Sequence, residues 1–171
     1  MKDLKKYIRD VPDFPKKGII FKDITTLLKR GEIFKEVIDT FAERYKASNL
    51  DSIVSVEARG FIMGSALAYR LGTGLIPVRK KGKLPYKTER ITYDLEYGTD
   101  TLEIHRDAIN PKDRVLIIDD VMATGGTISA VAQLVEKQGG EIVEIAFLIE
   151  LAFLNGRDKL KKYDVFSLIQ Y

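Results

Sequence analysis

The sequence predicts an α/β domain in which a parallel sheet is covered by helices on both faces. Short runs of β-branched and other apolar residues alternate with segments whose apolar residues recur at steps of three and four. Several of the short runs are continuously apolar, which is typical of strands buried on both faces. The connections between these segments are short, as expected for strand–helix–strand units with right-handed crossovers.

The individual elements follow from these patterns. The expected strands are residues 52–56, 75–79, 114–118, 141–149 and 165–169. The expected helices are residues 33–45, 61–71 and 128–135. Gly72 follows the second helix and Gly139 with Gly140 follows the third, in the position of a C-terminal cap.

Two regions do not fit the alternation. Residues 1–30 carry Pro12, Pro15 and Gly18 in a mixed pattern and are expected to form a small subdomain near the sheet. Residues 80–107 are expected to form a two-stranded ribbon. Its alternating apolar residues are Ile91, Tyr93, Leu95 and Tyr97, then, after a turn at Gly98–Asp100, Leu102 and Ile104. No repeat or linker divides the chain, so we interpret residues 1–171 as one domain.

The composition excludes several classes of protein. The chain has 171 residues, 45% of them hydrophobic and 31% charged, which suits one globular domain. There is no cysteine, so disulfide scaffolds, thiolate metal sites and cysteine nucleophiles are excluded. The single histidine, His105, carries no motif and is interpreted as structural. A net charge of +3 is too small to indicate nucleic-acid binding.

The sequence also lacks a segment suited to crossing a membrane. The most apolar stretch, residues 145–154, is interrupted by Glu150 and is shorter than the ~20 residues that a bilayer requires. The first residues are charged and have no apolar core of a secretory signal. We therefore expect a cytoplasmic protein.

The most informative segment is residues 115–127. A strand is followed by Asp119 and Asp120, then by a loop of small residues, then by a helix. The loop consists of Ala123, Thr124, Gly125, Gly126 and Thr127. In an open parallel sheet, ligands bind beyond the carboxyl ends of the strands. Small residues let the backbone approach a ligand, and free amides at a helix N-terminus favour an anion, so this loop suits a phosphate monoester.

A purely structural interpretation of this loop is also available. Gly-Gly before a helix is common in ordinary turns, and the chain has neither the GxxxxGK[ST] nor the GxGxxG phosphate motif. The combination of a buried strand, two acids, a small-residue loop and a helix favours the phosphate site over the ordinary turn.

The two acids suggest a second ligand group. Adjacent carboxylates ~5 Å apart repel by about 3 kcal/mol at an effective dielectric constant of ~20. Asp119 and Asp120 could form an ordinary solvated turn, but a divalent cation or the vicinal diol of a ribose would offset their charge. A phosphate and a ribose side by side indicate a phosphorylated sugar.

Two further segments carry positive charge. Glu57–Gly60 is a second strand-to-helix connection, where Arg59 would offer a planar guanidinium to phosphate, or would simply be exposed. Residues 79–90 contain six basic side chains and one acid, Glu89, which is either a positive binding surface or a solvated loop.

Residues 115–127 resemble the phosphoribosyl pyrophosphate (PRPP) motif of type I phosphoribosyltransferases. The resemblance continues over almost the full length, through Val11–Pro15, Glu57–Phe61 and Phe166–Tyr171, where it is specific to the adenine-using branch of the family. It implies a parallel sheet flanked by helices, an N-terminal hood at residues 1–30 and a flexible β-hairpin flap at residues 80–107. It also implies a cis peptide at Glu57–Ala58.

The resemblance assigns roles to individual residues. PRPP and AMP would be bound by Arg59, Arg79, Lys80, Lys83, Asp119, Asp120, Ala123, Thr124, Gly125, Gly126 and Thr127. Adenine would be bound by Ile20, Phe21, Lys22 and Leu151, with the backbone of Ile20 and Lys22 supplying hydrogen bonds. The family often has arginine at position 22. The catalytic residues would be Glu96, Arg59, Asp119 and Asp120, with Glu96 handling the proton of the purine.

The implied reaction joins adenine to PRPP and gives AMP and diphosphate. Mg²⁺ would be the cofactor, held mainly by substrate oxygens and water rather than directly by the protein. A homodimer is implied, with no nucleic acid or membrane partner. Two alternatives remain open: a phosphoribosyltransferase for xanthine, hypoxanthine or orotate, and a non-catalytic regulator that senses PRPP.

Overall fold

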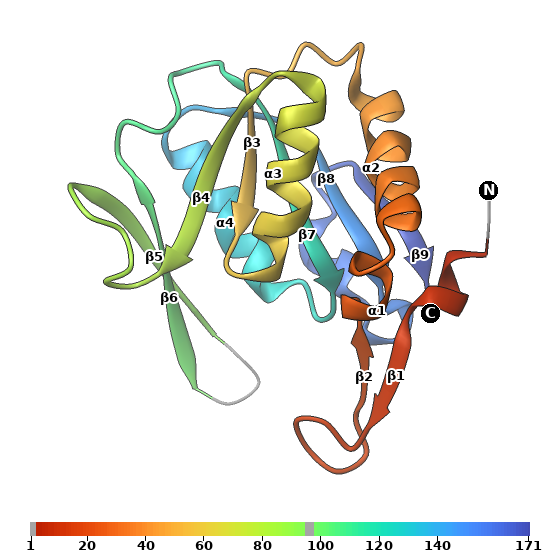
Figure 1. Ribbon diagram of the computed structural model, residues 1–171. Helices are drawn as coiled ribbons and strands as arrows, with labels where there is room; N and C mark the ends of the chain where they lie inside the picture. The colour runs from red at the N-terminus through yellow and green to blue at the C-terminus, as the bar shows by residue number, and fades with distance from the viewer. Residues whose placement is uncertain (1–2, 95–97) are drawn as a thin grey trace.

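The computed structural model describes residues 3–94 and 98–171 and centres on a seven-stranded sheet (Figure 1). The strands lie in the order β5 (Thr88–Asp94), β6 (Thr99–His105), β4 (Gly74–Lys80), β3 (Ser52–Val56), β7 (Arg114–Met122), β8 (Glu141–Glu150) and β9 (Val165–Gln170). Strands β4, β3, β7, β8 and β9 are mutually parallel, and the β5–β6 hairpin joins β4 in antiparallel pairing. The predicted α/β fold with a mainly parallel sheet is confirmed.

Helices cover both faces of this sheet. On one face, α2 (Gly31–Tyr45) and α3 (Arg59–Leu71) bury apolar stripes, and Phe41 and Leu67 form a cluster with Leu116 of β7. On the other face, α4 (Gly126–Lys137) packs Val131 in a cluster with Ile117 of the same strand. Successive residues of β7 therefore serve opposite cores, as strand geometry requires.

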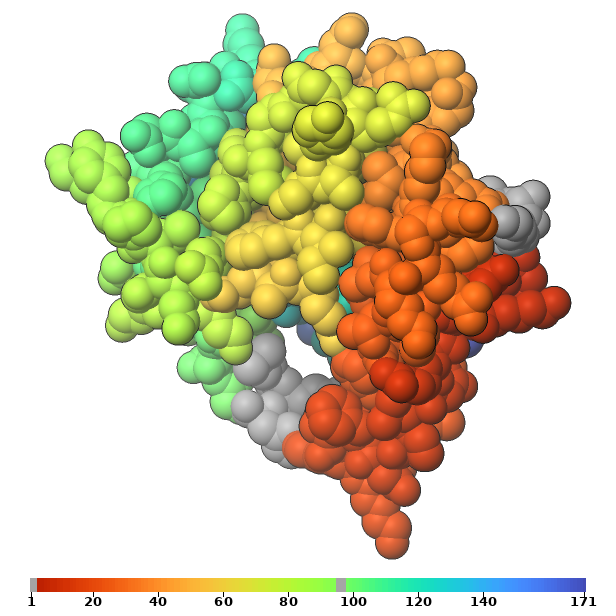
Figure 2. Space-filling view, in the orientation of Figure 1, coloured from red at the N-terminus to blue at the C-terminus, as the bar shows by residue number. Residues whose placement is uncertain are grey.

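The N-terminal segment is built from short elements. It contains the 3₁₀ turn η1 (Leu4–Tyr7), the strands β1 (Arg9–Pro12) and β2 (Ile20–Asp23), and the one-turn helix α1 (Thr25–Leu28). Strands β1 and β2 form an antiparallel ribbon separate from the main sheet, while Leu27 is buried in the core beneath α2. This ribbon and the β5–β6 hairpin project from the same end of the molecule, and Figure 2 shows the surface hollowed between them.

The structure corrects several sequence-based boundaries. Strand β7 continues to Met122, beyond the expected end at residue 118, so Asp119 and Asp120 lie within the strand. The expected turn at Gly98–Asp100 is also wrong, because Thr99 and Asp100 already belong to β6 and Asp94 pairs with Thr99. Helices α3 and α4 each begin two residues earlier than expected, which places Arg59 in the first turn of α3.

The expected helix-ending glycines behave as capping residues. Gly72 is the C-terminal cap of α3 with a φ of 70°, and Gly139 follows α4 with a φ of 85°. Both angles lie in the left-handed region that glycine adopts readily. Two further 3₁₀ turns, η2 (Ala152–Leu154) and η3 (Gly156–Leu160), connect β8 to β9.

Three of the predicted ribbon residues, Leu95, Glu96 and Tyr97, lie outside the described residues. Within the parts of the chain that are described, no helix has the length and apolar character to cross a membrane.

Candidate active site

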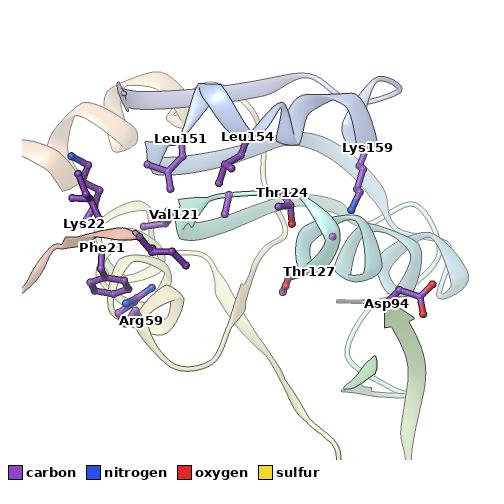
Figure 3. A pocket seen from close by; sticks show the side chains of 14 residues that line it. Phe21, Lys22, Arg59, Asp94, Val121, Thr124, Thr127, Leu151, Leu154 and Lys159 are labelled. Atoms are coloured by element: carbon purple, nitrogen blue, oxygen red, sulfur yellow. The ribbon is translucent and has the colours of Figure 1, made fainter. Parts of the chain in front are cut away.

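Three neighbouring cavities open where β3, β7 and β8 reach their carboxyl ends. The largest has a volume of about 690 Å³ and lies between the β1–β2 ribbon, the 123–127 loop and the segment after β8 (Figure 3). A second cavity of about 410 Å³ lies beside β3 and the hairpin, and a third of about 100 Å³ lies under the 123–127 loop. Arg59, Val121 and Thr127 line both larger cavities, so these form one continuous site.

The 123–127 loop delivers the N-terminus of α4 into this site. Gly125 is the cap residue, with a φ of 76°, and a Cβ added to it would collide with the carbonyl oxygen of Gly156. No side chain caps the helix, so its first amide groups remain available to an anion. Thr124 and Thr127 point their hydroxyl groups toward the same space (Figure 3). The loop thus has the geometry expected of a phosphate cradle.

Asp119 and Asp120 line the same 410 Å³ cavity although they are consecutive strand residues. Ile118 and Val121 both pack against the core under α2 and α3, even though three positions separate them. The alternation of side chains along β7 therefore changes phase between them, and the two acids lie at that point. This explains how adjacent carboxylates reach one cavity.

The environment of each acid differs. Asp120 is only 4% exposed, and its Oδ2 lies 2.6 Å from Nε of Arg59. Asp119 is partly exposed and accepts a hydrogen bond of 2.9 Å from the amide of Asp120. Burial raises the pKa of both carboxyls, the charge of Asp120 raises the pKa of Asp119 further, and Arg59 opposes the rise at Asp120.

Gly60 packs so closely against the carboxylate of Asp119 that a side chain at position 60 would collide with it. A Cβ added to Gly60 would lie 2.6 Å from Oδ1 of Asp119. The first turn of α3 therefore approaches the carboxyl end of β7 closely enough for Arg59 to reach Asp120. Thus Arg59 is held between the acids and the ring of Phe21, whose centroid is 4.9 Å from its guanidinium carbon.

An apolar compartment occupies one end of the 690 Å³ cavity. Ile20 and Phe21 of β2 line it from one side, and Leu151 lines it from the segment after β8. Figure 3 shows Phe21 and Leu151 on different sides of the cavity, with Val121 between the elements that carry them. A flat apolar ring such as a purine fits between such walls.

The side chain of Lys22 is turned to other partners. Its Nζ lies 2.7 Å from Oδ1 of Asp10 and 3.9 Å from the ring centroid of Tyr171. Only its backbone is then free to serve a ligand in the cavity. The backbone role that the family resemblance implies for Lys22 stays a prediction.

The connection after β3 is organised by Glu57. The Glu57–Ala58 peptide is cis, as the resemblance implied. Oε1 of Glu57 accepts a 2.6 Å hydrogen bond from the amide of Lys80, and Oε2 accepts a 2.9 Å bond from Arg79. Burial alone would raise the pKa of Glu57, but these two donors outweigh it and lower the pKa.

The predicted basic residues are only partly brought together. Lys80 lines the 410 Å³ cavity and pairs with Asp100 at 3.0 Å, which raises the pKa of Lys80. Arg79 donates instead to Glu57 and to the carbonyl oxygen of Lys83, at 3.1 Å. Neither Arg79 nor Lys83 lines any of the three cavities described above.

The structure adds residues that sequence reasoning missed. The hydroxyl groups of Tyr93 and Thr127 lie 3.2 Å apart and connect the hairpin to α4. Leu154 and Lys159 line the largest cavity from the segment after β8, and Asp94 lines it from the hairpin. The alternating pattern of the ribbon was the only signal for Tyr93, and no motif marked the other residues.

The polar groups that line the site are mainly carboxylates, cations and backbone amides. Across residues 3–94 and 98–171, no three His, Asp or Glu side chains are grouped as ligands for a metal ion. Asp119 and Asp120 offer a pair of acidic side chains in the 410 Å³ cavity, which could support a cation whose other ligands come from substrate and water. This donor set fits a Mg²⁺ ion carried in with a phosphorylated substrate.

Comparison with known proteins identifies the class. Residues 23–170 match the phosphoribosyl transferase domain family. An adenine phosphoribosyltransferase from Syntrophotalea carbinolica is 62% identical over 171 residues, covering 100% of both chains. The crystal structure of adenine phosphoribosyltransferase from Thermoanaerobacter pseudethanolicus has a TM-score of 0.96 at 54% identity and covers 99% of each chain.

A third relative carries ligands. Adenine phosphoribosyltransferase from Saccharomyces cerevisiae, crystallised with adenine and D-2,5-dideoxy-2,5-imino-altritol 1,6-bisphosphate, has a TM-score of 0.93 at 41% identity, covering 98% of this chain and 97% of that one. The chain therefore belongs to the phosphoribosyltransferase family. Within that family it falls in the branch of the adenine phosphoribosyltransferases.

Proposed function

We propose that this chain transfers the 5-phosphoribosyl group of PRPP to adenine and releases AMP and diphosphate. One observation carries the proposal: a phosphate cradle at residues 123–127 and an apolar compartment between Phe21 and Leu151 share one cavity. Asp119, Asp120 and Arg59 lie beside it, where the ribose and the departing diphosphate would bind. The names of the relatives agree with a purine salvage reaction.

The reaction forms a C1′–N9 bond and breaks the bond from C1′ to the diphosphate oxygen. Positive charge develops at C1′, so the carboxylates of Asp119 and Asp120 support the transition state as well as the ribose hydroxyls. The proton on N9 of adenine leaves during the reaction, and Glu96 is proposed to accept it. Arg59 and Lys80 face the negative charge that accumulates on diphosphate.

A Mg²⁺ ion, when bound with PRPP, supplies charge neutralisation to the diphosphate leaving group. We propose that substrate oxygens and water provide most of its ligands. Arg79 and Lys83 are proposed to act on diphosphate only after their present contacts rearrange, or from a partner subunit of a homodimer. The hood at residues 1–30, the flexible flap at residues 80–107 and a cytoplasmic location stay predictions, as does the single domain spanning residues 1–171.

Measuring diphosphate release tests the proposal. The protein is incubated with Mg²⁺, PRPP and, in separate reactions, adenine, hypoxanthine, xanthine or orotate. We expect release with adenine that exceeds release with every other base by at least about 100-fold, because a mismatched edge would leave the backbone hydrogen bonds proposed for Ile20 and Lys22 unpaired. Preference for another base would identify a different transferase. PRPP binding without release from any base would indicate a regulator.

A further inference from the structure

The cations that line the site are not equivalent, because most already have an acidic partner. Arg59 pairs with Asp120 at 2.6 Å, Lys80 with Asp100 at 3.0 Å, and Lys22 with Asp10 at 2.7 Å. A cation that is already neutralised in this way offers a substrate anion less attraction than an unpaired one. The question is then which positive charge is left for the phosphate in the 123–127 cradle.

Lys159 is the remaining cation on the wall of the largest cavity. It lies on η3 and, within the described residues, has neither an ion pair nor a hydrogen bond from its side chain. Figure 3 shows its side chain extending from η3 toward the start of α4. Its Nζ is 3.6 Å from the Cβ position that Gly126 lacks, so the ammonium group lies against the first residue of the helix.

The backbone below Lys159 is held firmly against the cradle. Gly156, in the same 3₁₀ turn, is buried, and a Cβ added to it would meet the carbonyl oxygen of Ala123 and approach the amide nitrogen of Gly125 to 3.2 Å. Arg157 anchors the turn through hydrogen bonds of 2.8 Å from Nε and Nη2 to the two carboxylate oxygens of the buried Glu150. The base of the Lys159 side chain is therefore fixed relative to the helix N-terminus.

We infer that Lys159 supplies the side-chain positive charge for the terminal monophosphate of the substrate and product. This inference rests on the proposed function, and it adds a binding residue that no sequence motif marked. Amides and hydroxyl groups of the 123–127 loop are neutral donors, whereas a phosphate monoester carries between one and two negative charges at neutral pH. An ammonium group within reach of the same phosphate complements them as a mobile point charge.

Direct binding measurements test this assignment with the whole chain. Dissociation constants are measured by calorimetry for AMP, adenosine, ribose 5-phosphate and diphosphate, on the wild type, Lys159→Gln and Lys161→Gln. Lys161 is the matched control, because it follows closely in the chain, is exposed and pairs with Asp158 at 3.1 Å. Circular dichroism and thermal unfolding establish that each variant is folded.

We expect Lys159→Gln to weaken AMP and ribose 5-phosphate about 10-fold or more, while adenosine and diphosphate change less than twofold. Lys161→Gln should leave all four constants unchanged, and Lys159→Arg should retain most of the affinity. Unchanged AMP and ribose 5-phosphate affinity in Lys159→Gln overturns the inference, as does an equal loss for AMP and adenosine or a loss for diphosphate.

The same measurements separate this inference from the proposed function. If the wild type binds ribose 5-phosphate in a Lys159-dependent manner but makes no AMP from adenine and PRPP, the residue assignment stands and the reaction is wrong. If the wild type makes AMP and Lys159→Gln binds it normally, the reaction stands and the residue assignment is wrong. If the wild type binds no phosphate ester, both are wrong.

Discussion

Arg59 connects the groups of the site that carry charge. It pairs with the nearly buried Asp120, stacks near Phe21 and lines both larger cavities. Its planar guanidinium can face a carboxylate and a phosphate at once, which a lysine cannot do in the same geometry. The sequence indicated a phosphate contact for Arg59 but offered no signal for its pairing with Asp120.

We expect Arg59→Met to lower kcat/KM by about 10²–10³, because one preorganised positive group is lost and Asp120 is left without its counter-charge. Arg59→Lys should recover part of the loss. Steady-state kinetics with adenine and PRPP provide the measurement, with thermal unfolding as the control for folding. A kcat/KM within twofold of wild type in Arg59→Met would contradict this role.

The raised pKa of Asp119 lowers the stability of the folded protein by an amount that depends on pH. Its pKa is raised in the folded protein by burial and by Asp120, so the folded state binds more protons than the unfolded state between the ordinary aspartate range and the raised pKa. Stability therefore falls as pH rises through this window, and the cost is fully present above it. Below the ordinary aspartate range, near pH 4, both states are protonated and the cost disappears.

Asp119→Asn removes this charge while keeping an oxygen that can accept the amide of Asp120. We expect the variant to raise Tm by about 2–4 °C at pH 7–8, which corresponds to ~1 kcal/mol for a chain of this size, and to lose that advantage in acid. Its turnover should fall by about 10² or more. Calorimetry across pH measures the first effect. A variant less stable than wild type at pH 7 would show that the charge is not a cost.

At the scale of elements, the segment after β8 forms part of the cavity wall, although no motif in its sequence indicates this. Leu151 precedes η2, Leu154 lies in η2 and Lys159 lies in η3, so three residues of the cavity wall depend on how this segment is held. The Glu150–Arg157 pair supplies that support, and Gln170 also donates to Glu150 at 3.1 Å.

Arg157→Met should destabilise the protein by about 2 kcal/mol, because it leaves the buried carboxylate of Glu150 with one hydrogen-bond donor fewer on each oxygen. It should also raise KM for adenine and PRPP together, since the same segment faces both. Urea unfolding and steady-state kinetics measure the two effects. The double variant Glu150→Gln/Arg157→Met should recover part of the stability; a further loss instead would argue against the pair as the anchor.

The β5–β6 hairpin makes a polar contact with the cradle through Tyr93 and Thr127. A neutral hydrogen bond contributes about 0.5–1.5 kcal/mol, and we expect this one to be made more often in the substrate complex than in the free protein, so Tyr93→Phe should raise KM for PRPP by about two- to tenfold. Tyr69→Phe, at a residue that is 91% exposed, is the matched control and should have no effect. Equal KM values for both variants would place the contact outside the reaction cycle.

At the scale of the whole molecule, the sheet and its covering helices could be predicted because burial imposes repeating patterns. Strand β3 is buried at every position, and α2 shows a regular apolar stripe, so both were visible in the sequence. The end of β7 could not be placed, because Asp119 and Asp120 look like turn residues, whereas the pairing of Asp119 with Phe147 and of Val121 with Ile149 in β8 continues the strand past them.

The candidate site was predictable where a motif spans consecutive residues and unpredictable where distant elements meet. The 123–127 loop carries its chemistry in its own sequence, so its position over α4 followed directly. Lys159 lies over the same loop only because Gly156 and Arg157 fix its turn, and no local pattern reveals such a placement. Arg79 shows the converse, since the family resemblance assigned it a contact with PRPP, whereas its side chain pairs with Glu57.

The proposed base pocket and the proposed phosphate cradle share one cavity, and a structure of the AMP complex tests their assignment most directly. We expect the phosphate against residues 124–127 with Lys159 within hydrogen-bond distance, the ribose hydroxyls facing Asp119 and Asp120, and the adenine ring between Phe21 and Leu151. AMP bound elsewhere, or bound with its phosphate away from the start of α4, would contradict the account.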